Sequence, residues 1–196
     1  MPFEPIKKIV SPVILLQTEN IDTDRIIPAR FLKSVDSSGF GKNLFHDWRY
    51  KPDGSPNPDF ILNQPGKQGK ILLTGKNFGC GSSREHAAWA LCQYGFRVII
   101  SSGFADIFKN NALNNGLLPI EVDEVQHTLL TQSCLSFPDE PWTIDLASQS
   151  ITYHQSADPI AFDINPFRKE CLMSGSDLVD YLAGLKKKII EYESNH

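Results

Sequence analysis

The sequence predicts an α/β fold with a largely parallel sheet at its core. Between residues 70 and 122, three short aliphatic runs alternate with two stretches rich in helix-forming residues. Aliphatic runs of this length are typical of buried strands, and strands that alternate with helices form right-handed crossover units. The spacing therefore favours parallel strands, because a helical crossover returns the chain to the sheet in the same direction.

The elements follow in order along the chain. Residues 8–18 are expected to form a strand that Pro12 interrupts, and proline within a strand indicates an edge or a bulge. The central alternation has strands at 70–74, 96–100 and 117–122, with helices at 87–94 and 104–115. A glycine follows each of these two helices, and glycine readily adopts the left-handed conformation of a helix cap.

The C-terminal third adds a hairpin and further helices to this core. Residues 123–132 are expected to form a short helix, and residues 142–146 and 150–154 a β-hairpin outside the parallel sheet. Helices are also predicted at 166–174 and at about 176–193, where leucine and isoleucine recur at helical spacing. These last helices should cover one face of the domain.

A long segment from about residue 31 to residue 69 is rich in glycine, proline, asparagine and aromatic side chains. A connection of this length inside a compact domain is usually functional or disordered. Its aromatic residues indicate packing against another surface. Two alternatives follow: the segment folds back as a lid, or it docks on another subunit.

Length and charge limit the classes of function. The 196 residues, 41% of them hydrophobic, suit a single domain over residues 1–196. The formal net charge of -4 argues against a general nucleic-acid or membrane surface, since both partners call for a basic excess. The N-terminus lacks a signal-peptide pattern and no apolar run reaches the length of a membrane span, so we expect a cytoplasmic protein.

The cysteines are far apart in the sequence and form no Cys-x-x-Cys pair: they are Cys80, Cys92, Cys134 and Cys171. Neither a zinc site nor an iron–sulfur site is therefore indicated in this chain. Cys80 alone lies in a glycine-rich stretch, where the positive end of a helix could lower the pKa of its thiol. A nucleophilic cysteine is thus one alternative for this stretch.

The most informative stretch is residues 77–86, Asn-Phe-Gly-Cys-Gly-Ser-Ser-Arg-Glu-His, between a predicted strand and a predicted helix. Its glycines let the backbone approach a ligand, and the start of the helix directs unpaired N–H groups at that ligand. Ser82 and Ser83 add hydroxyl groups, although either could simply cap the helix. Arg84 adds a guanidinium that binds a carboxylate through two parallel bonds. The spacing matches neither a Walker loop, nor a hydrolase nucleophile elbow, nor a dinucleotide fingerprint.

A second polar stretch, residues 20–28, follows the N-terminal strand. Asp22, Asp24 and Arg25 surround a threonine there, ahead of an apolar Ile-Ile pair. The stretch is either part of a site or a turn in which the aspartate side chains bind their own backbone. A calcium loop is unsupported, because the required glycine and distal glutamate are missing.

These two stretches, together with Ser-Gly-Phe-Ala-Asp-Ile-Phe at 102–108, resemble the swivelling domain of the aconitase family. The resemblance runs in order along nearly the whole chain. It implies a compact swivelling β/β/α domain with barrel-like closure around the parallel core. It also implies a hydro-lyase reaction, in which a small hydroxy dicarboxylic acid such as 2-isopropylmalate is dehydrated and then rehydrated.

The resemblance further implies roles for residues of the two polar stretches. Ser82 is expected to act as the base and Asp24 as an active-site acid. Arg84 is expected to bind a carboxylate of the substrate. Ser83 and the backbone of Gly81 are expected to donate hydrogen bonds to an oxyanion.

The resemblance also implies a larger partner subunit. Its [4Fe-4S] cluster would act as a Lewis acid on the substrate hydroxyl, while this chain closes over it. Phe31 and Leu32 are expected to meet the isopropyl group, although Arg30 and Arg49 lie nearby in the sequence, so charge alone does not settle the substrate. Two other functions stay open: a related hydro-lyase for homoaconitate or methylmalate, and an anion-binding module without catalytic activity.

Overall fold

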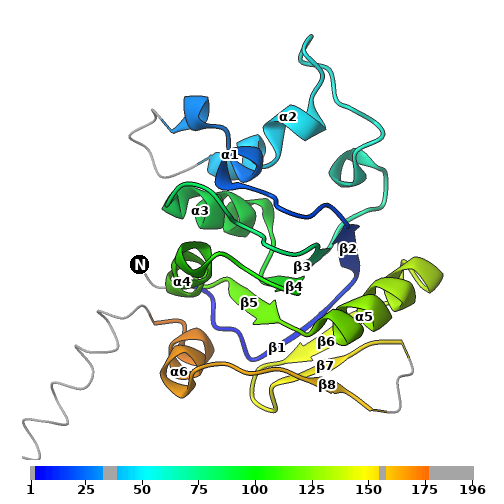
Figure 1. Ribbon diagram of the computed structural model, residues 1–196, viewed down its shortest axis with the longest axis vertical. Helices are drawn as coiled ribbons and strands as arrows, with labels where there is room; N and C mark the ends of the chain where they lie inside the picture. The colour runs from blue at the N-terminus through cyan, green and yellow to red at the C-terminus, as the bar shows by residue number, and fades with distance from the viewer. Residues whose placement is uncertain (1–2, 33–38, 155–157, 177–196) are drawn as a thin grey trace, which may run out of the picture.

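The computed structural model describes residues 3–32, 39–154 and 158–176, and their strands form two four-stranded sheets (Figure 1). The first sheet is parallel, in the order β2-β3-β4-β5, with β2 at Val13–Leu16, β3 at Ile71–Thr74, β4 at Val98–Ser101 and β5 at Leu118–Glu121. The second is antiparallel, in the order β1-β6-β7-β8, with β1 at Lys8–Ser11, β6 at Trp142–Asp145, β7 at Ser150–Thr152 and β8 at Ile160–Ala161. The predicted parallel core is confirmed.

Pro12 separates the two sheets. The chain leaves β1 at Ser11 and enters β2 at Val13, and each of these strands lies at the end of its own sheet. Proline has no backbone N–H to donate, so the sheet tolerates it best outside a central strand. The prediction that Pro12 marks an edge is therefore confirmed.

Helices and the second sheet cover opposite faces of the parallel sheet (Figure 1). On one face, Leu72 and Ile99 pack with α3 (Glu85–Tyr94) and α4 (Asp106–Asn114). On the other, Leu73 and Ile100 pack with α5 (Glu124–Ser136), the antiparallel sheet and α6 (Pro166–Ser174). Because both faces are covered, β3 and β4 are buried throughout, and each has three consecutive aliphatic residues rather than an alternating pattern.

Two predicted elements are larger in the structure than the sequence suggested. The helix predicted at 123–132 runs on to Ser136, and Asp123 and Gln126 form a capping box at its start. The predicted hairpin is confirmed as β6 and β7, but β1 and β8 join it to complete a sheet. The strands pair as two separate sheets in the described residues, and barrel-like closure stays a prediction. The helix predicted at about 176–193 lies outside the described residues, apart from Ser176.

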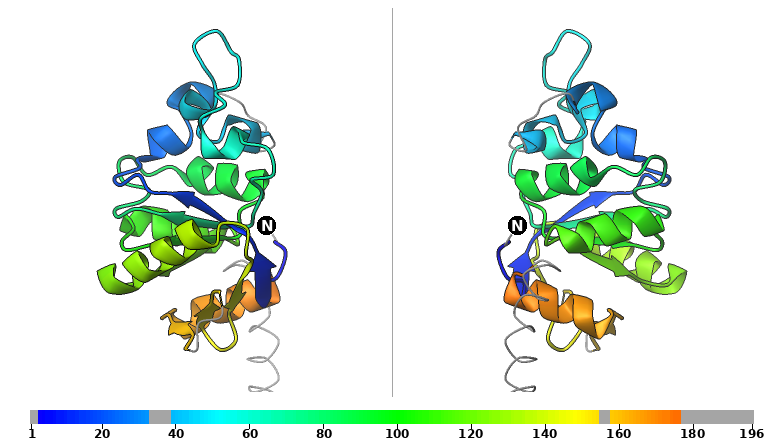
Figure 2. Two further views of the ribbon diagram at one scale, coloured as in Figure 1. Left: turned by 90° about the vertical axis from the view of Figure 1, so that its right-hand side faces the viewer. Right: turned by 90° about the vertical axis from the view of Figure 1, so that its left-hand side faces the viewer.

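The described part of the 31–69 segment packs on its own chain, and its action as a lid or as a docking segment stays a prediction. It contains short helical turns: the end of η1 (Ala29–Phe31), η2 (Phe40–Asn43), α2 (His46–Arg49) and η3 (Ile61–Asn63). Phe40, Leu44 and Phe45 are at most 2% exposed. The ring of Phe40 lies 5.1 Å from that of His86 on α3. Figure 2 shows this segment, in cyan, at the end of the molecule opposite α6.

None of the helices in the described ranges is long and apolar enough to cross a membrane.

Candidate active site at the ends of the parallel strands

Two loops lie side by side where parallel strands β2 and β3 end. The Gly79 N–H donates to the carbonyl of Ile21 at 2.7 Å, and the Thr23 N–H donates to the carbonyl of Cys80 at 2.9 Å. Residues 20–24 thus extend the pairing of β2 with β3 into the loops. Ligands of open parallel sheets bind in this position, beyond the carboxyl ends of the strands.

A third loop, which follows β4, joins the same cluster. The Phe78 N–H donates to the carbonyl of Gly103 at 3.0 Å, and the Ala105 N–H donates to that of Phe78 at 3.1 Å. The buried Ser101 hydroxyl donates to the carbonyl of Gly75 at 2.8 Å. The three stretches singled out in the sequence therefore come together in space.

Glycine is required at position 79 for two reasons. Its φ of +76° lies in the left-handed region, which a side chain disfavours. A Cβ atom there would also lie 2.2 Å from Cγ of Phe108, in the buried face of α4. Gly81 has a φ of +90° but more space, since its nearest neighbour would be 3.4 Å away. The loop can thus approach α4 only without a side chain at Gly79.

Neither serine caps the helix that follows this loop. The N-cap residue of α3 is Arg84, and no side chain accepts a hydrogen bond from the first turn. Ser82 and Ser83 are exposed and precede the cap. Within the described residues the Ser82 hydroxyl makes no hydrogen bond. The structural alternative of a capping serine is therefore wrong, and the positive end of α3 stays available to an anion.

Arg84 and Asp24, 60 residues apart, form a close ion pair. Nη1 of Arg84 lies 2.5 Å from Oδ1 of Asp24, and the two side chains are 17% and 54% exposed. Nη1 is buried, and the Asp24 carboxylate is the group that meets its charge. A guanidinium carries five N–H donors, so one carboxylate does not saturate it.

The environment of Asp24 favours its charged form. Polar contact with Arg84 lowers the pKa of the Asp24 carboxyl, partial burial opposes this shift, and the charge of Arg84 and the Ala29 N–H reinforce it. That N–H donates to Oδ1 of Asp24 at 3.2 Å. Since Ala29 is the first residue of η1, Asp24 connects Arg84 to the turn that carries Phe31.

Asp22 and Thr23 hold the backbone of the two loops. Asp22 caps α1 (Thr23–Ile26), where its carboxylate accepts from the Arg25 N–H at 2.7 Å, so the local-turn alternative is right for this aspartate. Thr23 is 2% exposed, and its hydroxyl donates to the carbonyl of Ser82 at 3.0 Å. Sequence reasoning missed this contact, because nothing local distinguishes a threonine that bonds to a distant loop.

The remaining predicted site residues are apolar or are cysteines. Phe31 and Leu32 are half-buried and pack against the apolar core beneath α3. Desolvation first, and then the charge of Asp22, raise the pKa of the Cys80 thiol, which does not support a nucleophilic role. In the described ranges, no three potential ligands among His, Cys, Asp and Glu lie close enough together to hold a metal ion.

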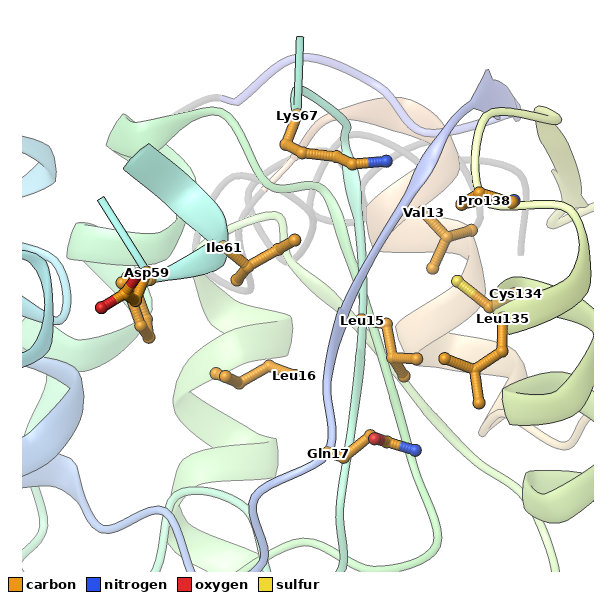
Figure 3. Close-up of a pocket in the computed structure, with 11 residues that line it drawn as sticks. Val13, Leu15, Leu16, Gln17, Asp59, Ile61, Lys67, Cys134, Leu135 and Pro138 are labelled. Atoms are coloured by element: carbon orange, nitrogen blue, oxygen red, sulfur yellow. The ribbon is translucent and has the colours of Figure 1, made fainter. Parts of the chain in front are cut away.

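A separate cavity of about 410 Å³ lies between β2 and α5 (Figure 3). Leu15 and Leu135 face each other across it, and most of its other lining residues are also apolar. Its cationic residue, Lys67, has its ammonium group 3.1 Å from the Asp139 carboxylate. None of the predicted site residues lines this cavity.

The fold and the site define an α/β domain whose glycine loop has an uncapped helix start, two serines and a half-buried arginine, which are features that suit an anion. The sequence profile of the family named Aconitase C-terminal domain matches residues 6–125. A 3-isopropylmalate dehydratase small subunit from Christiangramia forsetii is 51% identical over 92% of this chain and 88% of its own length. One from Cytophaga hutchinsonii is 50% identical over 94% and 92%.

A solved structure agrees with these relatives. The crystal structure of 3-isopropylmalate dehydratase from Methanocaldococcus jannaschii has a TM-score of 0.66 and 28% identity, and the match covers 95% of this chain and 99% of that one. The chain therefore belongs to the aconitase C-terminal domain family, in the group formed by the small subunits of 3-isopropylmalate dehydratase.

Proposed function

We propose that this chain works with a large subunit to interconvert 2-isopropylmalate and 3-isopropylmalate by dehydration and rehydration, a step of leucine biosynthesis. Membership of the small-subunit group supports a large-subunit partner. The observation that carries the chemistry is that the Ser82 hydroxyl is exposed, makes no hydrogen bond within the described residues and lies just before the uncapped start of α3. We also propose that residues 1–196 act as a single swivelling domain.

Ser82 is proposed as the base that removes the proton from the substrate carbon. A serine hydroxyl is a weak acid, so the surroundings must stabilise its anion. The first-turn N–H groups of α3, the Arg84 guanidinium and donors at Ser83 and Gly81 provide positive potential on this side. Electrostatic stabilisation of this kind is strong only where water is excluded.

That requirement supports a partner surface over the glycine loop. Gly81, Ser82 and Ser83 are exposed in this chain by itself, and water would protonate an alkoxide there. A second subunit that covers the loop would remove this water and strengthen each interaction inside the site. We therefore propose that the reaction takes place at the subunit interface.

Arg84 is proposed to bind a carboxylate of the substrate. Its Nη1 lies 2.5 Å from Oδ1 of Asp24, so that carboxylate holds one end of the guanidinium. A substrate carboxylate could bind the remaining N–H donors in the two-point geometry that guanidinium favours. Because its pKa is lowered, Asp24 is a poor proton donor at neutral pH, so we propose that it orients Arg84 rather than supplies a proton.

The iron–sulfur cluster is expected on the large subunit, because the cysteines of this chain do not fit one. Cys80 and Cys92 are half-buried, Cys134 and Cys171 are buried, and no described group of three ligands surrounds a common point. Departure of the substrate hydroxyl would depend on that cluster. Phe31 and Leu32, on or next to η1, are proposed to contact the isopropyl group.

A reconstituted assay tests this proposal. Purified chain is mixed with a cluster-loaded large subunit and supplied with 2-isopropylmalate, homoaconitate or methylmalate. We expect turnover of 2-isopropylmalate. The kcat of Ser82→Ala should be lower by about 10²- to 10⁴-fold, because a general base contributes that much. Ser136→Ala, which removes another exposed hydroxyl at the far end of α5, is the matched control. Preference for another diacid would contradict the proposed substrate. Full activity in Ser82→Ala would contradict the proposed base.

A further inference from the structure

The buried side chain of Thr23, which lies outside the glycine loop, forms a hydrogen bond to the backbone of that loop. The hydroxyl of Thr23 donates to the carbonyl of Ser82 at 3.0 Å, across 59 residues of sequence. The backbone N–H of the same residue donates to the carbonyl of Cys80 at 2.9 Å. Thr23 is 2% exposed, so its side of both bonds is shielded from water.

This tie matters because the loop has little stiffness of its own. Gly79 and Gly81 both have positive φ angles, and glycine backbone has more accessible conformations than any other. The Ser82 hydroxyl makes no hydrogen bond in the described residues that would hold it in place. The position of Ser82 therefore depends on what holds its backbone.

The hydrogen bond to the Ser82 carbonyl sets the direction of the Ser83 N–H and limits the position of the Ser82 hydroxyl. A trans peptide is planar, so its N–H points opposite to its C=O. With the Ser82 carbonyl directed at Thr23, the Ser83 N–H is directed away from Thr23. The same carbonyl carbon is attached to the Cα of Ser82, so fixing it also limits where the hydroxyl oxygen can lie.

Thr23 is itself well anchored. It begins α1, which Asp22 caps, and the helix ends in the fully buried residues Ile26 and Ile27. The carbonyl of Ile26 accepts from the Phe45 N–H at 2.8 Å. The hydroxyl of Thr23 is thus a fixed point against which the flexible loop is held.

We propose that the Thr23 hydroxyl is a positioning group for catalysis, one that aligns the Ser82 base and the Ser83 N–H with the substrate. The inference rests on the function proposed above. It differs from a role in folding alone, because the backbone bond to Cys80 already joins the two loops and survives any side-chain change. The hydroxyl adds alignment of the peptide that bears the base.

Steady-state kinetics of the reconstituted two-subunit enzyme tests this inference with four variants. Thr23→Val keeps the shape and removes the hydroxyl, whereas Thr23→Ser keeps the hydroxyl. Thr74→Val is the matched control, since Thr74 is a fully buried threonine whose hydroxyl has no hydrogen-bond partner. We expect Thr23→Val to lower kcat by about 10- to 100-fold with KM within about threefold, because small misplacements have effects of that size.

The control and the rescue should behave differently. Thr23→Ser and Thr74→Val should keep kcat within about threefold. In Thr23→Val, the pH at half-maximal kcat on the acidic limb should move upward, because a misaligned Ser82 is harder to ionise. Thr23→Ala also lacks the hydroxyl and is smaller than valine, so it should show the same loss of kcat and control for any effect of valine on packing.

Other outcomes would overturn the inference. They are an unchanged kcat in Thr23→Val, a loss of kcat that Thr23→Ser does not rescue, or a loss of folding or of large-subunit binding in both Thr23→Val and Thr23→Ala. Circular dichroism and co-elution detect the last of these. Wild-type enzyme without activity on any diacid would instead refute the proposed function, so the two failures are distinguishable.

Discussion

Replacing Gly79 with alanine should destabilise the chain more than the same change at an unconstrained glycine. Both Gly79 and Gly54 have left-handed backbones, with φ of +76° and +81°. That backbone costs alanine about 1–2 kcal/mol, while the reduced freedom of the unfolded chain offsets about 0.4–1 kcal/mol. Gly54→Ala, whose Cβ would meet nothing within 4 Å, should therefore cost about 0–1.6 kcal/mol.

Gly79→Ala adds a steric cost. Its Cβ would lie 2.2 Å from Cγ and 2.5 Å from Cβ of Phe108. The clash is at the root of that side chain, so rotation cannot relieve it, and Phe78 confines the ring from 5.1 Å away. Overpacking of this kind costs about 1–3 kcal/mol, which should separate the two variants by that amount. Urea unfolding of both measures the difference, and equal losses of unfolding free energy would refute the assignment of Gly79 to close packing.

Three further predictions concern the site. Arg84→Lys should raise KM for the diacid about tenfold or more in the reconstituted assay, since an ammonium cannot grip a carboxylate at two points; an unchanged KM would make Arg84 structural. The lowered pKa of Asp24 means that its stabilising contribution is complete above its ordinary value of 3.8 and disappears as pH falls through the lower folded value. Asp24→Asn should therefore reduce the pH dependence of unfolding below about pH 4, and identical pH profiles would contradict the ion pair. Because its thiol pKa is raised, Cys80 should react with iodoacetamide at pH 7 more slowly than free cysteine, and Cys80→Ser should keep kcat within about threefold; fast alkylation would contradict the desolvated thiol.

The sequence by itself determined the parallel core and the position of the glycine loop that we propose as the site. The strands and helices between residues 70 and 122 were predictable because aliphatic runs, helix formers and terminal glycines act locally. The glycine loop was identifiable for the same reason, since Gly79, Gly81 and the following helix are neighbours along the chain. The edge position of Pro12 followed from its missing N–H.

The tertiary structure decided which distant groups meet. The pairing of β1 with β6 joins residues more than 130 positions apart, and β8 is too short to have a signal of its own. The contacts of Arg84 with Asp24 and of Thr23 with Ser82 each cross about 60 residues. Whether Ser82 caps α3 also depended on the path of the loop. Composition and periodicity report only on sequence neighbours, whereas the Arg84–Asp24 and Thr23–Ser82 contacts exist because the ends of parallel strands converge at one edge of a sheet.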